Sequence, residues 1–200
     1  CQNKRCLVPT PCKNLEADHS EYIQLLKEVE KIPGIKKVFI RSGIRFDYML
    51  ADRSDAFFRK LVRDHVSGQL KVAPEHCADK VLRIMRKPSW ENYLQFRQLF
   101  LRINDEAGLK QQLIPYFISS HPGCTKQEMQ ALADETKRMH YRPEQVQDFT
   151  PTPMTLATTM FYTGINPYTG QKVYVARTAQ EKKEQNQYFF WYKKPIHNRK

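Results

Sequence analysis

Segments typical of helices and strands alternate along most of the chain, and this alternation constrains the fold more than any other feature. A helix is predicted over residues 18–32, where Asp18 and Glu21 form a capping signal and Pro33 and Gly34 end the pattern. Strand patterns then occur at residues 38–40, 69–76 and 111–121. Because parallel strands need long crossover connections, which are usually helices, this order predicts an α/β fold with a parallel sheet and helices packed outside it.

The predicted helices that follow the strands have clear boundary signals. One opens at Asp52 or Ser54 and ends at Ser67 and Gly68, and a short one covers residues 78–87 before Pro88. Ser89 caps a helix over residues 90–107, and Thr125 with Glu128 forms a capping box for a helix to about His140.

The predicted sheet looks incomplete. It opens on a helix with no strand before it, and three parallel strands leave two open edges. We therefore predict that residues 1–147 are the second half of a larger, partial (β/α) barrel. Residues 148–200 are rich in Pro, Thr and Gly and are predicted to be a loop-rich extension, with a short strand at KVYVAR (172–177) and a basic, aromatic tail.

The formal net charge of +12 is concentrated at the C-terminus, where residues 177–200 hold seven Lys or Arg and two Glu. This excess permits contact with nucleic acid or another phosphate-bearing ligand without selecting either. No apolar run approaches the roughly 18–20 residues that span a bilayer, and no secretory signal is visible. The five cysteines, an odd number, favour a reducing compartment. We predict a cytoplasmic protein with no membrane partner.

Polar side chains gather where the predicted strands end. Function sits at the carboxyl ends of strands in parallel α/β folds, so one rim is expected to carry three clusters. These clusters are Arg41, Ser42 and Arg45; Glu75, His76 and Cys77; and Ser119, Ser120, His121 and Cys124. Arginine forks bind carboxylates or phosphates and a carboxylate accepts from hydroxyls, so the set suits an anionic ligand with a ribose or amino acid part.

Each cluster also has a simpler interpretation. Arg41 could pair with Asp47, and both histidines could be hydrogen-bonded strand-end residues. Both cysteines fit small buried residues. A metal bound by His121 and Cys124, or a Cys–His nucleophile, has no further support in the sequence, and no residue is assigned as catalytic.

At these residues the chain resembles a known family. RSGIRFDYMLAD, LKVAPEH with DKVLRIMRKP, YFISSHPGCT and QDFTPTPMTLATTMFYTG are similar to the latter half of the YgiQ-like radical SAM proteins. The resemblance runs over nearly the whole chain. It implies a partial barrel in which a [4Fe–4S] cluster and S-adenosylmethionine generate a 5′-deoxyadenosyl radical that acts on a substrate, here unknown.

The resemblance also assigns roles by strand position. Arg41, Ser42 and Arg45 are the candidates for the methionine and ribose parts of S-adenosylmethionine. The stretch from Ala73 through Glu75 to His76, together with Ser119 to His121, is expected to contact ribose, adenine or substrate. The three-cysteine cluster motif, C-x3-C-x2-C, does not occur in this sequence. The chain is therefore expected to be inactive alone, to bind neither cofactor stably, and to partner the missing N-terminal half of the same protein.

Three cysteines open the chain in the pattern C-x4-C-x5-C, at Cys1, Cys6 and Cys12. They are candidate ligands of an auxiliary cluster or of zinc, with His19 as a fourth ligand. The alternative is a loop of reduced thiols.

Two other functions compete with the radical enzyme. A nucleic-acid-binding module would use the five aromatic residues 188–192 and the nearby lysines to stack bases and contact phosphates. If instead these rings pack on the fold, the lysines are merely solvated. A zinc-stabilised interaction domain would use the N-terminal cysteines, although their spacing matches no common zinc finger.

Overall fold

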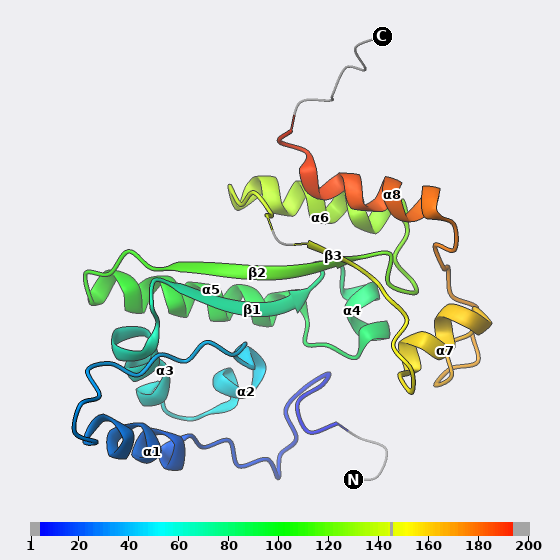
Figure 1. Cartoon of the computed structure of the whole chain (residues 1–200). Helices are drawn as coiled ribbons and strands as arrows, with labels where there is room; N and C mark the ends of the chain where they lie inside the picture. The colour runs from blue at the N-terminus through cyan, green and yellow to red at the C-terminus, as the bar shows by residue number, and fades with distance from the viewer. Residues whose placement is uncertain (1–4, 145, 194–200) are drawn as a thin grey trace. The chain divides into compact units, whose positions relative to one another are not determined.

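The fold is described by a computed structural model that covers residues 5–144 and 146–193 (Figure 1). Two compact units divide the chain. The first unit comprises Cys1–Pro74 and Pro88–Tyr116, and the second comprises Glu75–Lys87 and Phe117–Lys200. Each unit has its own packed interior and is treated by itself below.

Helices and three strands follow one another along the described chain. They are α1 (Ser20–Glu30), α2 (Phe46–Ala51), α3 (Ala56–Lys60), the π-helix η1 (Leu61–His65), β1 (Gln69–Glu75), α4 (Asp79–Met85), α5 (Trp90–Glu106), β2 (Gln112–Ser119), α6 (Lys126–Arg138), β3 (Val146–Asp148), α7 (Leu156–Thr163), α8 (Ala179–Gln187) and the 3-10 helix η2 (Tyr188–Phe190).

The three strands form one sheet in the order β1-β2-β3. β2 and β3 run parallel, with Phe117 opposite Val146 and Ser119 opposite Asp148. The parallel three-stranded sheet confirms the predicted α/β class, and β1 and β2 confirm the strands predicted at residues 69–76 and 111–121.

The strand predicted at residues 38–40 is wrong. Its backbone groups are satisfied by the end of η1, because Ile40 N–H donates to the His65 carbonyl and the Val38 carbonyl accepts from the His65 ring. A single parallel bridge, Ile44 with Val72, is the sheet-like contact of this segment. Because His65 at the end of η1 takes up these backbone groups, no ladder forms at residues 38–40.

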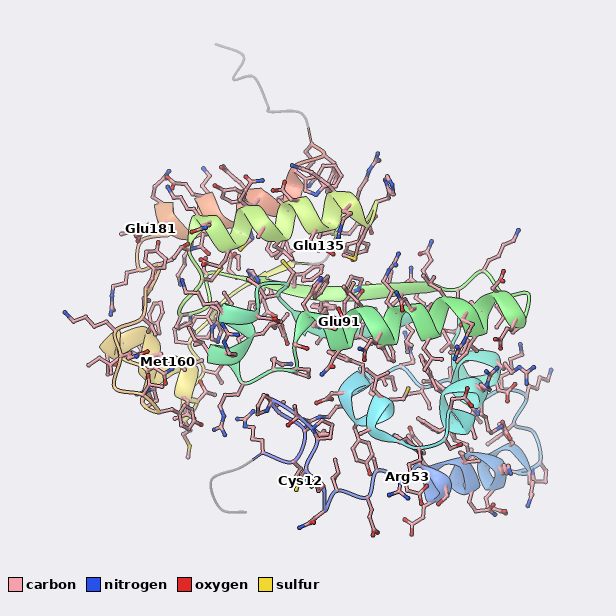
Figure 2. The ribbon with its side chains drawn as sticks, turned by 180° about the vertical axis from the view of Figure 1, so that it is seen from behind. Cys12, Arg53, Glu91, Glu135, Met160 and Glu181 are labelled. Carbon is pink, nitrogen blue, oxygen red and sulfur yellow. The ribbon has the colours of Figure 1, made fainter. Side chains whose placement is uncertain are left out.

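The C-terminal segment also differs from its prediction. KVYVAR forms no strand; one antiparallel bridge joins Ile165 to Lys172. The third strand is β3, and α7 and α8 form within residues 148–200, which were predicted to be a loop-rich extension. A capping box of Thr178 and Glu181 starts α8, and Glu181 is labelled in Figure 2. The caps predicted at Ser89 and at Thr125 with Glu128 are confirmed for α5 and α6.

Aromatic side chains build the interior of the first unit. Phe58 of α3 stacks on Phe96 of α5, with ring centroids 4.9 Å apart, and Phe46 of α2 lies 5.8 Å from the same Phe96 ring. All three residues are almost fully buried, as is Phe100 on the next turn of α5. The apolar face of α5 therefore anchors the short helices before it.

In the second unit, α6, α8 and η2 pack together, and Figure 1 shows α6 and α8 side by side. Met129, Leu132 and Phe189 are fully buried there. The aromatic run adds two hydrogen bonds, from Trp191 Nε1–H to Thr136 Oγ1 at 3.0 Å and from the Tyr192 hydroxyl to the Pro143 carbonyl at 2.7 Å.

The predictions on domain division and on membrane-spanning helices can also be compared with the fold. The division between residues 147 and 148 stays a prediction. Within the described residues, no helix combines the length and apolar character needed to cross a membrane.

The aromatic core of the first unit should dominate its stability. Phe58→Ala removes a ring with 1% of its surface exposed and is expected to lower the free energy of unfolding by about 3–5 kcal/mol. Phe39→Ala, at a phenylalanine that is 44% exposed, is the matched control and should change it by less than about 1 kcal/mol. Urea unfolding followed by circular dichroism measures both, and equal losses would contradict this account of the core.

Candidate functional site

The turn after β1 begins with a backbone conformation that costs energy. Glu75 has φ +71°, in the left-handed region that side chains other than glycine rarely adopt. Its carboxylate lies 3.2 Å from Lys87 Nζ, so the charge is partly neutralised. Next to it His76 is fully buried, and its Nδ1 accepts from the backbone N–H groups of Cys77 and Ala78 at 3.0 and 2.9 Å. His76 thus holds the turn in shape.

The turn after β2 repeats this arrangement. Ser120 has φ +61°, and its backbone N–H donates to Gln185 Oε1 at 2.9 Å. The Gln185 amide also donates to the Cys124 carbonyl at 2.8 Å, so one buried side chain of α8 spans the turn. Beside it, the Ser119 hydroxyl donates to Asp148 of β3, which also accepts from Asn186 at 2.8 Å.

A buried Cys–His pair joins the two turns. His76 Nε2 lies 3.5 Å from Cys124 Sγ. Because Nδ1 is occupied as an acceptor, Nε2 carries the proton and donates it to sulfur, while the thiol donates to the Thr125 carbonyl at 3.7 Å. The ring nitrogen nearest the sulfur therefore has no lone pair with which to accept the thiol proton.

Burial fixes both members of this pair in their neutral forms. Desolvation lowers the pKa of His76 to about 4 and raises the pKa of Cys124 to about 12. The same effect lowers the pKa of His121 to about 4 and raises that of Cys77 to about 12. An activated thiolate needs the opposite shifts, so the pair is a structural contact and not a nucleophile. Cys124 is buried, as the simpler interpretation of the sequence expected.

One polar atom at the turns has no partner. Ser120 Oγ is buried and makes no hydrogen bond within the described structure. A buried hydroxyl without a partner is costly, and the left-handed backbone at Glu75 and Ser120 adds strain at the same two turns. We define Glu75, His76 and Ser119–His121 as the strand-end site.

The predicted site residues divide between the two units. Glu75, His76, Ser119 and His121 all belong to the second unit, and the contacts above bring the turns that carry them together. Arg41, Ser42 and Arg45 belong to the first unit and are exposed. Arg45, rather than Arg41, pairs with Asp47, with Nε 3.0 Å from the carboxylate.

Sequence reasoning missed three polar residues of this region, Asp148, Gln185 and Asn186. Asp148 ends β3, a strand of three residues that gives almost no pattern in the sequence. Gln185 and Asn186 lie on α8, inside the segment that was predicted to be loop-rich. A buried Gln on a charged helix has no signal in a single sequence, because its partners are backbone groups 61 and 65 residues away.

Two of the three N-terminal cysteines, Cys6 and Cys12, lie within the described residues. Cys1 lies outside the described residues. Cys6 and Cys12 are joined by a backbone hydrogen bond, and Figure 2 shows Cys12 on the segment before α1. His19, the proposed fourth ligand, instead has Nδ1 2.7 Å from Asp52. The auxiliary metal site stays a prediction.

A different group of potential ligands lies in the first unit. In the part of the chain that is described, Glu30, Asp64 and His65 offer ligand atoms within 4.8 Å of one another. Lys60 Nζ already lies 3.0 Å from Glu30 and 3.2 Å from Asp64. A divalent cation at this group would therefore have to displace the Lys60 ammonium.

The aromatic residues 188–192 are partly packed, with Phe189 buried and the other four rings half-buried. Phe189 is 1% exposed, and Trp191 and Tyr192 are held by hydrogen bonds to Thr136 and Pro143. The contacts of Phe189, Trp191 and Tyr192 agree with the simpler interpretation, and base stacking by the other exposed ring faces stays a prediction. The basic residues from 194 onward lie outside the described residues.

A parallel α/β fold with polar turns at its strand ends is thus the class that the structure defines. Comparison with known sequences adds two findings. Residues 144–198 match a family model described as a domain of unknown function (DUF3362). Almost the whole chain is similar to bacterial proteins named UPF0313, the name given to the YgiQ-like family.

The similarity is high but covers one part of each relative. The UPF0313 protein of Clostridium perfringens is 56% identical over 182 residues, 91% of this chain and 28% of the relative. Those of Bacteroides thetaiotaomicron and Porphyromonas gingivalis are 53% and 52% identical over 201 and 202 residues, 96% and 97% of this chain and 32% of each relative. The chain therefore spans about a third or less of the length of these relatives.

The buried histidines make a prediction about pH. The unfolded chain binds protons at His76 and His121 near pH 6.5, whereas the folded chain binds them near pH 4, so stability must fall as pH drops below 6.5. Each histidine contributes at most about 1.4 kcal/mol per pH unit. His76→Asn keeps an acceptor for the turn and should remove about half of the slope of unfolding free energy between pH 6.5 and 5.

The exposed His140, where Asn also suits the left-handed backbone (φ +53°), supplies the control. His140→Asn should leave the wild-type slope in place. Denaturant titrations at a series of pH values measure it, and an unchanged slope in His76→Asn would show that His76 does not stay neutral on folding.

Proposed function

We propose that this chain is part of a larger radical S-adenosylmethionine protein, within which it forms the later strands of a partial barrel and contributes to cofactor binding. The observation that carries the proposal is Ser120 Oγ, a buried hydroxyl without a partner at the end of β2. The similarity to UPF0313 proteins about three times as long supports it, as do the sequence motifs that resemble the YgiQ-like family.

The strand-end site fits the ribose and adenine part of S-adenosylmethionine. The Ser120 hydroxyl offers a donor and acceptor that no described residue uses. The Glu75 carboxylate is 25% exposed and, although it pairs with Lys87, has oxygen lone pairs left to accept from ribose hydroxyls. His76 acts as a positioning residue, because both of its ring nitrogens are used to hold the turns.

The cysteines of the second unit do not fit the iron–sulfur cluster. The C-x3-C-x2-C motif does not occur in the sequence, and the buried Cys124 Sγ is already hydrogen-bonded to His76 and to the Thr125 carbonyl. No step of the cluster chemistry is therefore assigned to these cysteines. In the complete protein, S-adenosylmethionine bound with a cluster would supply hydrogen-atom abstraction, and the chain described here would bind and orient its nucleoside part.

The test uses the longer protein that contains this chain, reconstituted anaerobically with iron and sulfide. We expect dithionite and S-adenosylmethionine to give 5′-deoxyadenosine, measured by mass spectrometry. Ser120→Ala should weaken S-adenosylmethionine binding in equilibrium dialysis by about fivefold, the value of one neutral hydrogen bond. Ser67→Ala, at an exposed serine, is the control and should leave binding unchanged.

Two results would count against the proposal at different levels. Absence of 5′-deoxyadenosine from a protein whose cluster is verified by spectroscopy would remove cofactor cleavage as the function. Normal cleavage with unchanged affinity in Ser120→Ala would keep the function and remove the strand-end site from cofactor binding.

A further inference from the structure

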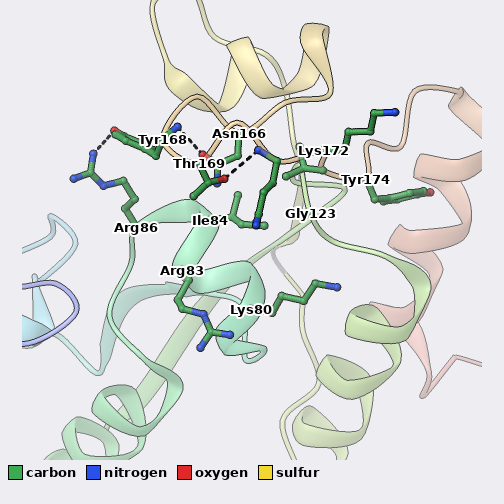
Figure 3. Close-up of a pocket in the computed structure, with 12 residues that line it drawn as sticks. Lys80, Arg83, Ile84, Arg86, Gly123, Asn166, Tyr168, Thr169, Lys172 and Tyr174 are labelled. Atoms are coloured by element: carbon green, nitrogen blue, oxygen red, sulfur yellow. Dashed lines mark hydrogen bonds between the residues drawn. The ribbon is translucent and has the colours of Figure 1, made fainter.

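A second site in the second unit is a pocket of about 570 Å³ beside the turn after β2. Figure 3 shows its lining: Lys80, Arg83 and Arg86 come from α4 and the residue that ends it, and Tyr168 and Lys172 come from the facing loop. Gly123 of the turn after β2 forms part of the wall. We call this the cationic pocket.

The charged residues that line the cationic pocket are all positive. Four of its lining residues are cations, and none of the described lining residues is a carboxylate. Lys80 lies 3.2 Å from Glu128, outside the lining, and Arg86 donates to the Tyr168 hydroxyl with its guanidinium 4.2 Å from the ring centroid. Arg83 and Lys172 are exposed and have no ion pair within the described structure. Two full positive charges are therefore free to meet an anion.

The walls are fixed by their own hydrogen bonds. Val173 N–H donates to the Gly164 carbonyl at 2.9 Å, and the Asn166 side chain accepts from Tyr168 N–H at 2.9 Å, which shapes the loop. Gly123 N–H donates to the Tyr174 carbonyl at 2.7 Å, and a Cβ at Gly123 would overlap Ile84 of α4. The cations thus project from a frame that is already ordered, which lowers the entropic cost of binding.

We propose that the cationic pocket binds the phosphate group of a nucleotide-sized ligand. A phosphate monoester carries close to two negative charges at pH 7, which matches the two unpaired cations, and the Arg83 guanidinium offers the planar fork that phosphate oxygens accept from. The volume lies within the roughly 300–1,000 Å³ of small-molecule sites. Tyr168 is 50% exposed, and although the Arg86 guanidinium lies over one face of its ring, a base would stack on the other face.

This proposal is independent of S-adenosylmethionine cleavage. The pocket is assigned from its own charges, and S-adenosylmethionine carries no phosphate. The ligand could be a free mononucleotide or the 5′ end of an RNA strand, which share the same phosphate chemistry. The test has to separate these two sources.

Isothermal titration of the 200-residue chain at low salt provides the test, with adenosine monophosphate, adenosine and a 5′-phosphorylated RNA hexamer as probes. The monophosphate should bind and adenosine should not, and S-adenosylmethionine should not compete. The double variant Arg83→Gln/Lys172→Gln should weaken monophosphate binding by about tenfold or more, since two charge-assisted contacts are removed. Equal affinity for the hexamer indicates a mononucleotide; tighter, more salt-sensitive binding of the hexamer indicates RNA.

Arg138→Gln/Lys183→Gln is the matched control, because it removes the same charge from α6 and α8 away from the pocket. It should change affinity by less than about twofold. If both double variants weakened monophosphate binding equally, the binding would reflect general charge attraction and the proposal would be overturned. The proposal would also be overturned if adenosine bound as tightly as the monophosphate, or if no probe bound to the folded chain.

Discussion

Buried backbone groups at the turns after β1 and β2 must find hydrogen-bond partners, and the second unit is organised around this requirement. His76 accepts from two backbone N–H groups after β1, and Gln185 bonds the backbone at both ends of the turn after β2. The contact of His76 with Cys124 then joins one turn to the other. These two side chains thus help to hold the strained backbone at Glu75 and Ser120.

The same requirement decides what the strand-end site can do chemically. A histidine that supports a turn through both ring nitrogens has no free nitrogen for proton transfer, and a thiol kept neutral by burial is a poor nucleophile. Within the described site, the Ser120 hydroxyl, the Glu75 carboxylate and the His121 ring, whose Nδ1 bonds the Pro122 carbonyl, are the groups that remain for a ligand. The geometry of the His76–Cys124 pair therefore suits it to holding the two turns together and not to covalent catalysis.

The strand-end site and the cationic pocket share one short segment. The turn that carries Ser120 and His121 continues directly into Gly123, which lines the pocket and bonds the loop that carries Lys172. Such continuity places the strand-end site, with its Ser120 hydroxyl and Glu75 carboxylate, beside the cationic pocket within one unit.

The sequence by itself determined the elements whose signals are local. Residues close together in the chain predict the caps of α5 and α6 and the strands β1 and β2. They also predict that Glu75, His76 and Ser119–His121 lie at the ends of strands. Only the tertiary structure decided features that depend on distant partners. The segment at residues 38–40 is no strand because His65 satisfies its backbone, and Asp148, Gln185 and the partly packed aromatic residues 188–192 take their places from contacts tens of residues away. A hydrogen bond to a distant backbone group leaves no periodicity in the sequence, so these roles appear only once the chain is folded.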